Sequence, residues 1–333
     1  MKRLCIFIFL SLFVVGMVKI TAEGQKDSGL SKPITIKLGH LYAPDHPYTS
    51  AIKEFAAEVK DLTNGQLVIK DYPAGQLGNE KDMCDAVSMN TLDMSIIGPG
   101  ELAKRHDPIF IFDGPYVFRD TNHMLKTAAS SVGQEMWDSL VEKSNIRVLN
   151  VLYYGKKHIT TSRRPVENPM DMRGLKFRVI DSPMNMAIAR SLGASPVPMA
   201  FTELYLGLQQ GVVEGQENPI PTIISQRLYE VQKYLILSGA ICQGATIVIS
   251  DKTYQSLSSE NQEILNNALN AMVIEVNDKI VESEFHQIEE LKEKGMIVIQ
   301  PDLEPFREAT KVVIKEFESK WGAGLYERIQ EVK

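Results

Sequence analysis

The sequence predicts an α/β protein built of two halves, and three observations lead to this prediction. Strand-like and helix-like segments alternate over residues 33–98, as they do at the start of a doubly wound sheet. The same alternation begins again at residues 147–155. Helical spacing of apolar residues over 259–295 predicts a helix on the order of 50 Å long, too long for one small domain. The 333 residues, 44% apolar and 23% charged, fit a soluble protein with two domains of ordinary size.

The first residues differ in composition from the rest of the chain. Lys2 and Arg3 precede an uncharged apolar run from Leu4 to Val18, and small and polar residues follow. This order is typical of a secretory signal peptide, here residues 1–22, and the apolar run is short for a membrane span. Because Lys19 interrupts the end of the run and no clean cleavage site follows, an uncleaved N-terminal anchor is the alternative. No cysteine stands where a lipoprotein signal would need one, directly after the run, so a lipid anchor is not expected.

Removal of residues 1–22 would leave an acidic exported protein. The net charge would move from −6 to −9 as three cations leave, which argues against a nucleic-acid partner. The remainder holds only Cys84 and Cys242, too few for a disulfide-stapled fold. We interpret them as buried small side chains, with a disulfide between them as the alternative. The six histidines form no metal-binding motif, so we expect neither a metal nor a cofactor.

The first half follows a strand, helix, strand, helix, strand order. Apolar and polar side chains alternate over residues 33–42, which predicts a strand. Apolar residues then recur at helical spacing from Tyr48 to Leu62, and Asn64-Gly65 ends this helix. We expect the next elements to be a strand over 66–73, a short helix over 80–89 and a buried strand over 92–98.

The second half repeats the pattern and ends in the long helix. After the strand at 147–155 we expect a strand over 175–180, a helix over 184–193, a proline-rich step over 195–199 and a helix over 201–211. Residues 244–252 look like a returning strand. Ser259 and Gln262 form a capping-box signal that opens the long helix, which continues to Gly295. A helix of this length is expected to span both halves.

Arg178 is unusual because it stands in an apolar strand. Strict alternation places it opposite Phe177 and Val179, so the simplest interpretation is a solvent-facing arginine. The chain contains no glycine-rich nucleotide motif, no G-x-S-x-G turn and no Cys/His nucleophile pair. No catalytic residue is therefore predicted, although an exported hydrolase that uses scattered carboxylates would leave little trace in a sequence.

Several stretches resemble the periplasmic solute-binding subunits of tripartite ATP-independent (TRAP) transporters, the dicarboxylate-binding-protein P family. The most specific are LKFRV and SLGASPVPMAFTELYLGLQQGVVEGQENP. Others follow the same order as in the family: LGHLYAPDHPY, YPAGQLGNEKDM, LDMSIIGPG, FIFDGPYVFRD and YYGKKHITTSRRPV. The resemblance covers residues 33–310. It implies the two-lobed periplasmic binding protein fold, with a cleft between two α/β domains.

The resemblance also implies the domain limits and the function. Lobe I would comprise residues 33–154 plus 244–282, and lobe II residues 155–243 plus 283–333, with the long helix spanning both. The protein would be no enzyme but a periplasmic, monomeric binding protein. It would close on a small organic acid and deliver the acid to the membrane permease subunits of a TRAP transporter. A ligand sensor that presents its closed form to a receptor is the alternative.

Site residues carry over from the family motifs. The arginine of the K-x-R-V strand fixes the ligand carboxylate in the family, which gives this role to Arg178, and the asparagine of QENP gives Asn218. A guanidinium suits the task because it offers five donors in a fixed geometry and keeps its charge. Where the family often has a second arginine, this chain has Lys157, which loses the planar fork. The candidates for contacts with the rest of the ligand are Glu80, His46 and Gln243.

Each of these residues also has an ordinary structural explanation. Lys157 would be an exposed loop lysine, Asn218 a turn residue before proline, and Glu80 an acid favoured in the first turn of a helix. His46 and Gln243 are equally open to either role. Tyr154 could line the cleft or pack beside Gly155.

The ligand is predicted less sharply than the family. The helix before QENP resembles that of sialic-acid binders, but Leu41 stands where they have asparagine and Gly98 where they have glutamate. The histidine turn and QLGNE resemble hexuronate-binding members more closely. We therefore expect a hexuronate or a related sugar acid, with a C4-dicarboxylate as the alternative.

Overall fold

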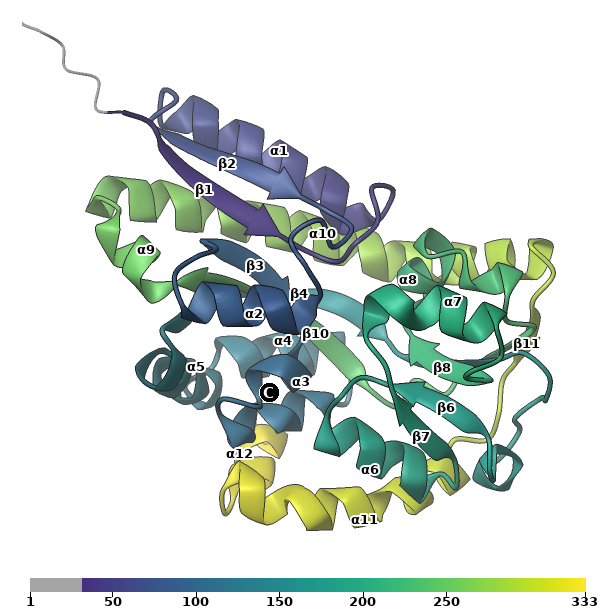
Figure 1. Ribbon diagram of the computed structural model, residues 1–333. Coiled ribbons are helices and arrows are strands. Elements are labelled where there is room, and N and C mark those ends of the chain that lie inside the picture. The colour runs from purple at the N-terminus through teal and green to yellow at the C-terminus, as the bar shows by residue number, and fades with distance from the viewer. Residues whose placement is uncertain (1–31) are drawn as a thin grey trace, which may run out of the picture. The chain divides into compact units, whose positions relative to one another are not determined.

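The computed structural model describes residues 32–333, in which two mixed β-sheets are surrounded by helices (Figure 1). The predicted signal peptide, residues 1–22, lies outside the described residues. Within residues 32–333, no helix combines the length and the apolar character needed to cross a membrane.

The first sheet has the strand order β2-β1-β3-β10-β4. Its strands are β1 (Ile34–Gly39), β2 (Leu67–Tyr72), β3 (Met94–Ile97), β4 (Ile146–Lys156) and β10 (Cys242–Ser250). Strand β1 pairs in parallel with β2 and β3, whereas β10 runs antiparallel to β3 and β4. The predicted order of the first half is confirmed, with α1 (Pro47–Leu62) and α2 (Glu80–Ser88) between the strands.

Helix α1 shows how local sequence fixes an element of this half. The His46 ring nitrogen Nδ1 accepts a hydrogen bond from the backbone N–H of Tyr48 at 3.2 Å, and Pro47 occupies the first helical position. The apolar positions Ile52, Phe55 and Val59 are buried. The helix therefore has a capped beginning and one face committed to the core.

The second sheet has the order β11-β9-β5-β8-β6-β7. Its strands are β5 (His158–Thr161), β6 (Lys176–Val179), β7 (Ser195–Pro198), β8 (Gly215–Asn218), β9 (Tyr234–Ile236) and β11 (Ile297–Ile299). The predicted proline-rich step is strand β7, which lies at the edge of the sheet, where a proline without an N–H is tolerated. The helices that accompany this sheet are α6 (Pro183–Ser191), α7 (Leu204–Gln209) and α8 (Ile220–Ser225).

Two predicted helix boundaries differ from the structure. The predicted helix over 201–211 is a 3-10 turn, Phe201–Glu203, followed by the short α7. The long helix α10 (Ser259–Glu293) is capped by Ser258, one residue before the predicted capping serine. The Ser258 hydroxyl accepts a hydrogen bond from the Asn261 backbone N–H at 3.2 Å.

Helix α10 packs against elements of both sheets, as predicted. It contacts α1 and β4 on the first sheet, and α8 and β11 on the second. It also protects the edge strand β4. The side chain of Asn277 accepts a hydrogen bond from the Tyr153 backbone N–H at 2.7 Å, and that of Asn270 accepts one from the Asn150 side chain at 2.6 Å. An edge strand with free N–H groups would otherwise invite pairing with another chain.

The remaining helices and 3-10 turns were not predicted from the sequence. They are α3 (Pro99–Leu102), a 3-10 helix η1 (Asp107–Asp113), α4 (Thr121–Ala129), α5 (Ser131–Ser144), α9 (Asp251–Ser256), α11 (Glu304–Trp321), α12 (Leu325–Gln330) and the short 3-10 turns Pro169–Met172 and Leu228–Glu230. Helix α11 packs against both α6 and η1. Helix α12 lies against α5, and the Ile329 carbonyl is 2.9 Å from Nε2 of His123 in α4.

The chain passes between the sheets close to the predicted site residues. Only Lys157 separates β4 of the first sheet from β5 of the second. Residues 237–241 make the return passage from β9 to β10. Cys84 and Cys242 are both buried and free, so the disulfide considered as an alternative is not formed.

Candidate functional site

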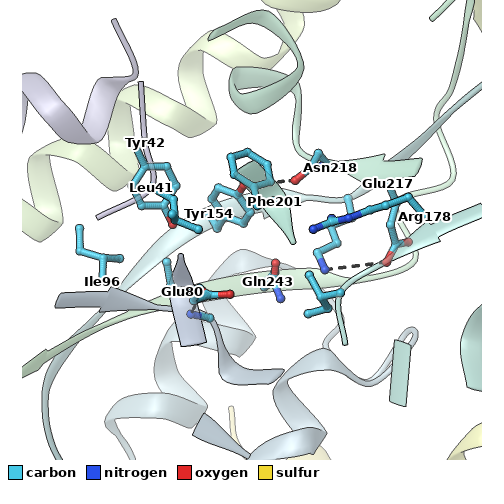
Figure 2. A pocket seen from close by; sticks show the side chains of 15 residues that line it. Leu41, Tyr42, Glu80, Ile96, Tyr154, Arg178, Phe201, Glu217, Asn218 and Gln243 are labelled. Atoms are coloured by element: carbon cyan, nitrogen blue, oxygen red, sulfur yellow. Dashed lines mark hydrogen bonds and ion pairs between the residues drawn. The ribbon is translucent and has the colours of Figure 1, made fainter. Parts of the chain in front are cut away.

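A cavity of about 60 Å³ lies where elements of the two sheets meet, and it gathers five of the six predicted site residues (Figure 2). These five are Glu80, Lys157, Arg178, Asn218 and Gln243. The other lining residues are Leu41, Tyr42, Ile96, Gly98, Tyr154, Ile180, Phe201, Glu217, Gly244 and Ala245. A wider cavity of about 350 Å³ shares Glu80, Arg178, Ile180 and Phe201 with the first.

Arg178 is buried, with 4% of its surface exposed, which excludes the solvent-facing interpretation. Both faces of β6 are covered, so Phe177 and Val179 are buried as well. The Arg178 Nε donates a hydrogen bond to the Met199 carbonyl at 3.0 Å. Its Nη2 is buried and has no hydrogen-bond partner among the described residues. Burial lowers the pKa of Arg178 to about 10, so the group stays cationic at neutral pH.

Lys157 and Glu217 form a pair in the cavity wall. The Lys157 Nζ lies 3.8 Å from Oε1 of Glu217, and Lys157 is 5% exposed, so it is no exposed loop lysine. Burial raises the pKa of Glu217, and the nearby Lys157 charge opposes this rise. Lys157 therefore already faces a carboxylate, whereas no carboxylate among the described residues lies within ion-pair distance of Arg178.

Asn218 belongs to a buried chain of hydrogen bonds. The Thr222 hydroxyl donates to the Tyr154 hydroxyl at 2.9 Å, which donates to Oδ1 of Asn218 at 3.2 Å. The Asn218 Nδ2 in turn donates to Gln216, and Gln216 donates to Thr160 at 2.8 Å. The amide oxygen of Asn218 thereby accepts one hydrogen bond, and one N–H of its Nδ2 remains as a donor.

Glu80 reaches the cavity from the first turn of α2. Its Oε1 accepts a hydrogen bond from the Gly98 backbone N–H at 2.6 Å. A Cβ at position 98 would lie 3.1 Å from this oxygen, so the glycine makes room for the carboxylate. Burial raises the pKa of Glu80, although the Gly98 hydrogen bond opposes the rise. The second oxygen of Glu80 is available as an acceptor for a ligand hydroxyl.

Gln243 is buried in the cavity wall, whereas His46 lies behind it. Gln243 stands at a register shift in β10 and donates through Nε2 to Oδ1 of Asp113. His46 is 1% exposed, does not line the cavity, and contacts Tyr42, with 4.6 Å between the ring centroids. Burial lowers the pKa of His46 to about 3. Any effect of His46 on a ligand would have to pass through the Tyr42 ring, which does line the cavity.

The sequence analysis did not predict most of the aromatic and aliphatic wall. Leu41 and Tyr42 follow the end of β1, Ile180 follows β6 and Phe201 follows β7. A signal for them exists, because ligands of open α/β sheets bind beyond the carboxyl ends of the strands. Glu217 was also not predicted, since its position next to Asn218 is compatible with a purely structural role.

The cavity therefore has two unlike ends. In Figure 2, Arg178 and Glu217 lie at one end, and Leu41, Tyr42 and Ile96 at the other, with Tyr154 and Phe201 between them. Cationic and amide donors at one end suit a carboxylate, and Glu80 with aromatic rings suits a hydroxylated carbon chain. Within residues 32–333, no cluster of three or more His, Cys, Asp or Glu side chains could hold a metal ion.

Comparison with known proteins gives a consistent assignment. The chain matches the family described as "Bacterial extracellular solute-binding protein, family 7", or DctP, over residues 38–320. It is 33% identical to the sialic acid-binding periplasmic protein SiaP of Vibrio cholerae, over 89% of this chain and 92% of that protein. It is 31% identical to the 2,3-diketo-L-gulonate-binding periplasmic protein YiaO of Escherichia coli, over 97% and 98%.

Solved structures show the same fold with different ligands. A TRAP periplasmic solute-binding protein of Polaromonas sp. JS666, bound to D-erythronate, has a TM-score of 0.86 and 31% identity, over 90% of this chain and 99% of that one. One of Roseobacter denitrificans with L-galactonate has a TM-score of 0.84 and 28% identity, over 90% and 99%. One of Sulfurospirillum deleyianum with succinate has a TM-score of 0.85 and 25% identity, over 91% and 100%.

These matches extend over almost the whole described chain and agree with the two-sheet fold. Family members of this kind are components of transport systems and have no catalytic activity, as predicted from the absence of catalytic motifs and from the resemblance. The chain belongs to family 7 of the bacterial extracellular solute-binding proteins, the DctP family of TRAP solute-binding proteins.

Proposed function

We propose that this protein captures a monocarboxylic sugar acid, such as a hexuronate, in the extracytoplasmic space and delivers it to the permease of a TRAP transporter. The observation that carries this proposal is the buried Arg178, whose Nη2 has no partner among the described residues. A desolvated guanidinium is costly unless an anion pairs with it. A ligand carboxylate supplies that anion, and the free N–H of Asn218 supplies a second donor to it.

The other end of the cavity favours hydroxyl groups over a second carboxylate. Glu80 is the charged residue there, and it would repel an anion. The charge of Lys157 is already balanced by Glu217. A C4-dicarboxylate would therefore leave one of its two charges without a cation, whereas the hydroxyls of a sugar acid can donate to Glu80. Gly98 and Leu41, which differ from the pattern of sialic-acid binders, favour a hexuronate or related acid over sialate.

The lobe limits inferred from the sequence remain part of this proposal. Lobe I, residues 33–154 plus 244–282, would carry the first sheet, and lobe II, residues 155–243 plus 283–333, the second. The contacts of α12 with α4 and α5 favour assigning the final residues to lobe I instead. The passages at Lys157 and at residues 237–241 would act as the hinge. We further propose export through the N-terminal segment 1–22 and function as a monomer.

A ligand screen tests the proposed function. The purified protein is heated with D-glucuronate, D-galacturonate, L-galactonate, D-erythronate and succinate, and hits are measured by calorimetry. A ligand present at a hundred times its dissociation constant should stabilise the fold by about 2.7 kcal/mol. We expect a sugar acid to give the largest shift, with no turnover of the ligand.

Neutral D-glucose is the matched control, because it has the hydroxyls without the carboxylate, and it should give no shift. Stabilisation by succinate alone would replace the sugar acid with the dicarboxylate alternative. The absence of any shift with all five acids would reject carboxylate binding.

A further inference from the structure

Asp113 is a buried carboxylate that lies outside the cavity wall and contacts a residue within it. It ends the 3-10 helix η1 and is fully buried. Its Oδ1 accepts from Gln243 Nε2, and its Oδ2 accepts from Nδ2 of Asn185 in α6 at 3.2 Å. A Cβ on Gly100 would lie 2.5 Å from Oδ2, so a third element closes tightly on the same carboxylate.

The chemistry of Asp113 fixes which way the Gln243 amide points. A carboxylate accepts hydrogen bonds and donates none. The group of Gln243 that faces Asp113 must therefore be the NH₂ group, and the amide oxygen must face the opposite way. Figure 2 shows the Gln243 oxygen on the side of Tyr154 and Asn218 and the nitrogen on the other side. An amide beside a neutral neighbour could present either group.

We propose that Asp113 is a positioning residue for ligand specificity: it holds Gln243 so that the cavity receives a carbonyl oxygen and not an NH₂ group. The inference rests on the proposed function and adds to it, because it assigns Gln243 to a ligand hydroxyl. Together with Glu80, Gln243 then makes this side of the cavity accept hydrogen bonds. Asn218, whose oxygen already accepts from the Tyr154 hydroxyl, adds an N–H donor on the Arg178 side. The ligand would therefore bind in one orientation, with its carboxylate at Arg178 and its hydroxyls at Glu80 and Gln243.

A charge-conserving exchange tests this proposal. The Gln243→Glu variant places two carboxylates against each other, so it should weaken binding of D-glucuronate or D-galacturonate at least about tenfold. The double variant Asp113→Asn with Gln243→Glu restores a donor opposite an acceptor, because the amide introduced at position 113 can donate to the carboxylate introduced at position 243. The cavity again receives an oxygen, and affinity should return to within about threefold of the wild type.

Two further variants separate this role from a general structural one. Gln243→Leu keeps the size of the side chain but removes the oxygen, and it should weaken sugar-acid binding at least about tenfold. Because the buried Asp113 loses one donor in this variant, the melting temperature of the unliganded protein should fall as well, and Asn185→Ala is the control for that loss. Asn185→Ala removes the other donor to Asp113 and should leave the affinity within about threefold. These variants also decide the question if Gln243→Glu alone fails to fold.

The proposal is overturned if the double variant binds no better than Gln243→Glu, or if Gln243→Leu binds like the wild type. If the wild type binds sugar acids and either of these outcomes is found, only the proposed role of Asp113 and Gln243 is rejected, and the proposed function stands. A wild type that binds neither D-glucuronate nor D-galacturonate removes the proposed function, and this inference with it.

Discussion

At the scale of single residues, the site depends on how each charge is paired. Glu217 compensates Lys157, a backbone N–H holds Glu80, and Arg178 is the cation of the cavity that keeps a buried donor without a described partner. A cavity with this pattern is close to balanced in charge before a ligand arrives. Under the proposed function, a ligand carboxylate would then complete a specific pair and not merely neutralise a cationic surface.

Replacement of Arg178 gives the sharpest prediction for the site. We expect Arg178→Ala to weaken sugar-acid binding by roughly 3 kcal/mol or more, since breaking a desolvated charge pair costs this much. This loss is at least about a hundredfold in the dissociation constant. Arg178→Lys should lose less, because it keeps the charge without the planar fork. Calorimetry with D-glucuronate or D-galacturonate measures both.

The matched control is Lys176→Ala, which removes an exposed cation two residues earlier on the same strand. It should leave the affinity unchanged. Equal affinities for the wild type and Arg178→Ala would remove Arg178 from the ligand site.

The sequence predicted the membership of the cavity better than its geometry. Motif positions named five of its lining residues, whereas periodicity placed Arg178 in solvent because alternation assumes that one face of a strand is wet. Strand β6 has both faces covered, which one strand's sequence does not reveal. His46 was named with the others, yet its place behind Tyr42 follows from aromatic packing between residues of one turn. Asp113 gave no signal, because its partners are 72 and 130 residues away in the chain.

At the scale of secondary structure, the elements with strong local signals were predicted at nearly their observed positions. These are β1, α1, β2, α2 and β3, whose period changes clearly and whose turns contain glycine, asparagine or proline. Strand β7 was not recognised, since Pro196 and Pro198 disguise an edge strand. The return of α12 to α4 and α5 depends on long-range contacts, such as those of Arg119 with the Gln330 and Val332 carbonyls.

The contact between α10 and the edge strand β4 can be tested through Asn277. We expect Asn277→Ala to lower the free energy of unfolding by about 1 to 3 kcal/mol, because it leaves the buried Tyr153 N–H without an acceptor. Urea denaturation measures the change. Asn267→Ala, an exposed position on the same helix, should cost much less. Equal losses at the two positions would mean that the hydrogen bond to Tyr153 is not responsible.

At the scale of the whole molecule, two histidines, His46 at the start of α1 and His158 in β5, connect stability to pH. Burial lowers the pKa of His46 to about 3 and that of His158, in β5, to about 4. Below pH 6.5 these histidines become protonated in the unfolded chain but stay neutral in the folded protein. The free energy of unfolding therefore falls as the pH falls towards the lowered pKa values of the folded state. Burial raises the pKa of Glu80 and Glu217, which acts in the opposite direction, because their ionisation costs the folded state stability as the pH rises.

The His46→Asn variant isolates the contribution of His46 to the pH dependence of the free energy of unfolding. Asparagine keeps an acceptor for the N-terminus of α1 but does not titrate. We expect the loss of unfolding free energy between pH 7 and pH 5 to be smaller in the variant than in the wild type by roughly 1 to 2 kcal/mol. Urea denaturation at several pH values provides the comparison. An identical pH dependence in both proteins would mean that His46 is protonated in the folded state near its ordinary pKa.

Under the proposed function, the Nη2 of Arg178, which has no hydrogen-bond partner among the described residues, would affect docking at the membrane permease. If a permease recognises the closed form of the binding protein, docking of an empty closed protein delivers no ligand and still occupies the docking site. When the cavity closes without a ligand, a cation is shut away from water with no anion beside it, which is unfavourable. Empty carriers should therefore spend little time in the form that docks. The guanidinium that we propose to hold the ligand carboxylate would in this way keep empty binding proteins from competing with loaded ones.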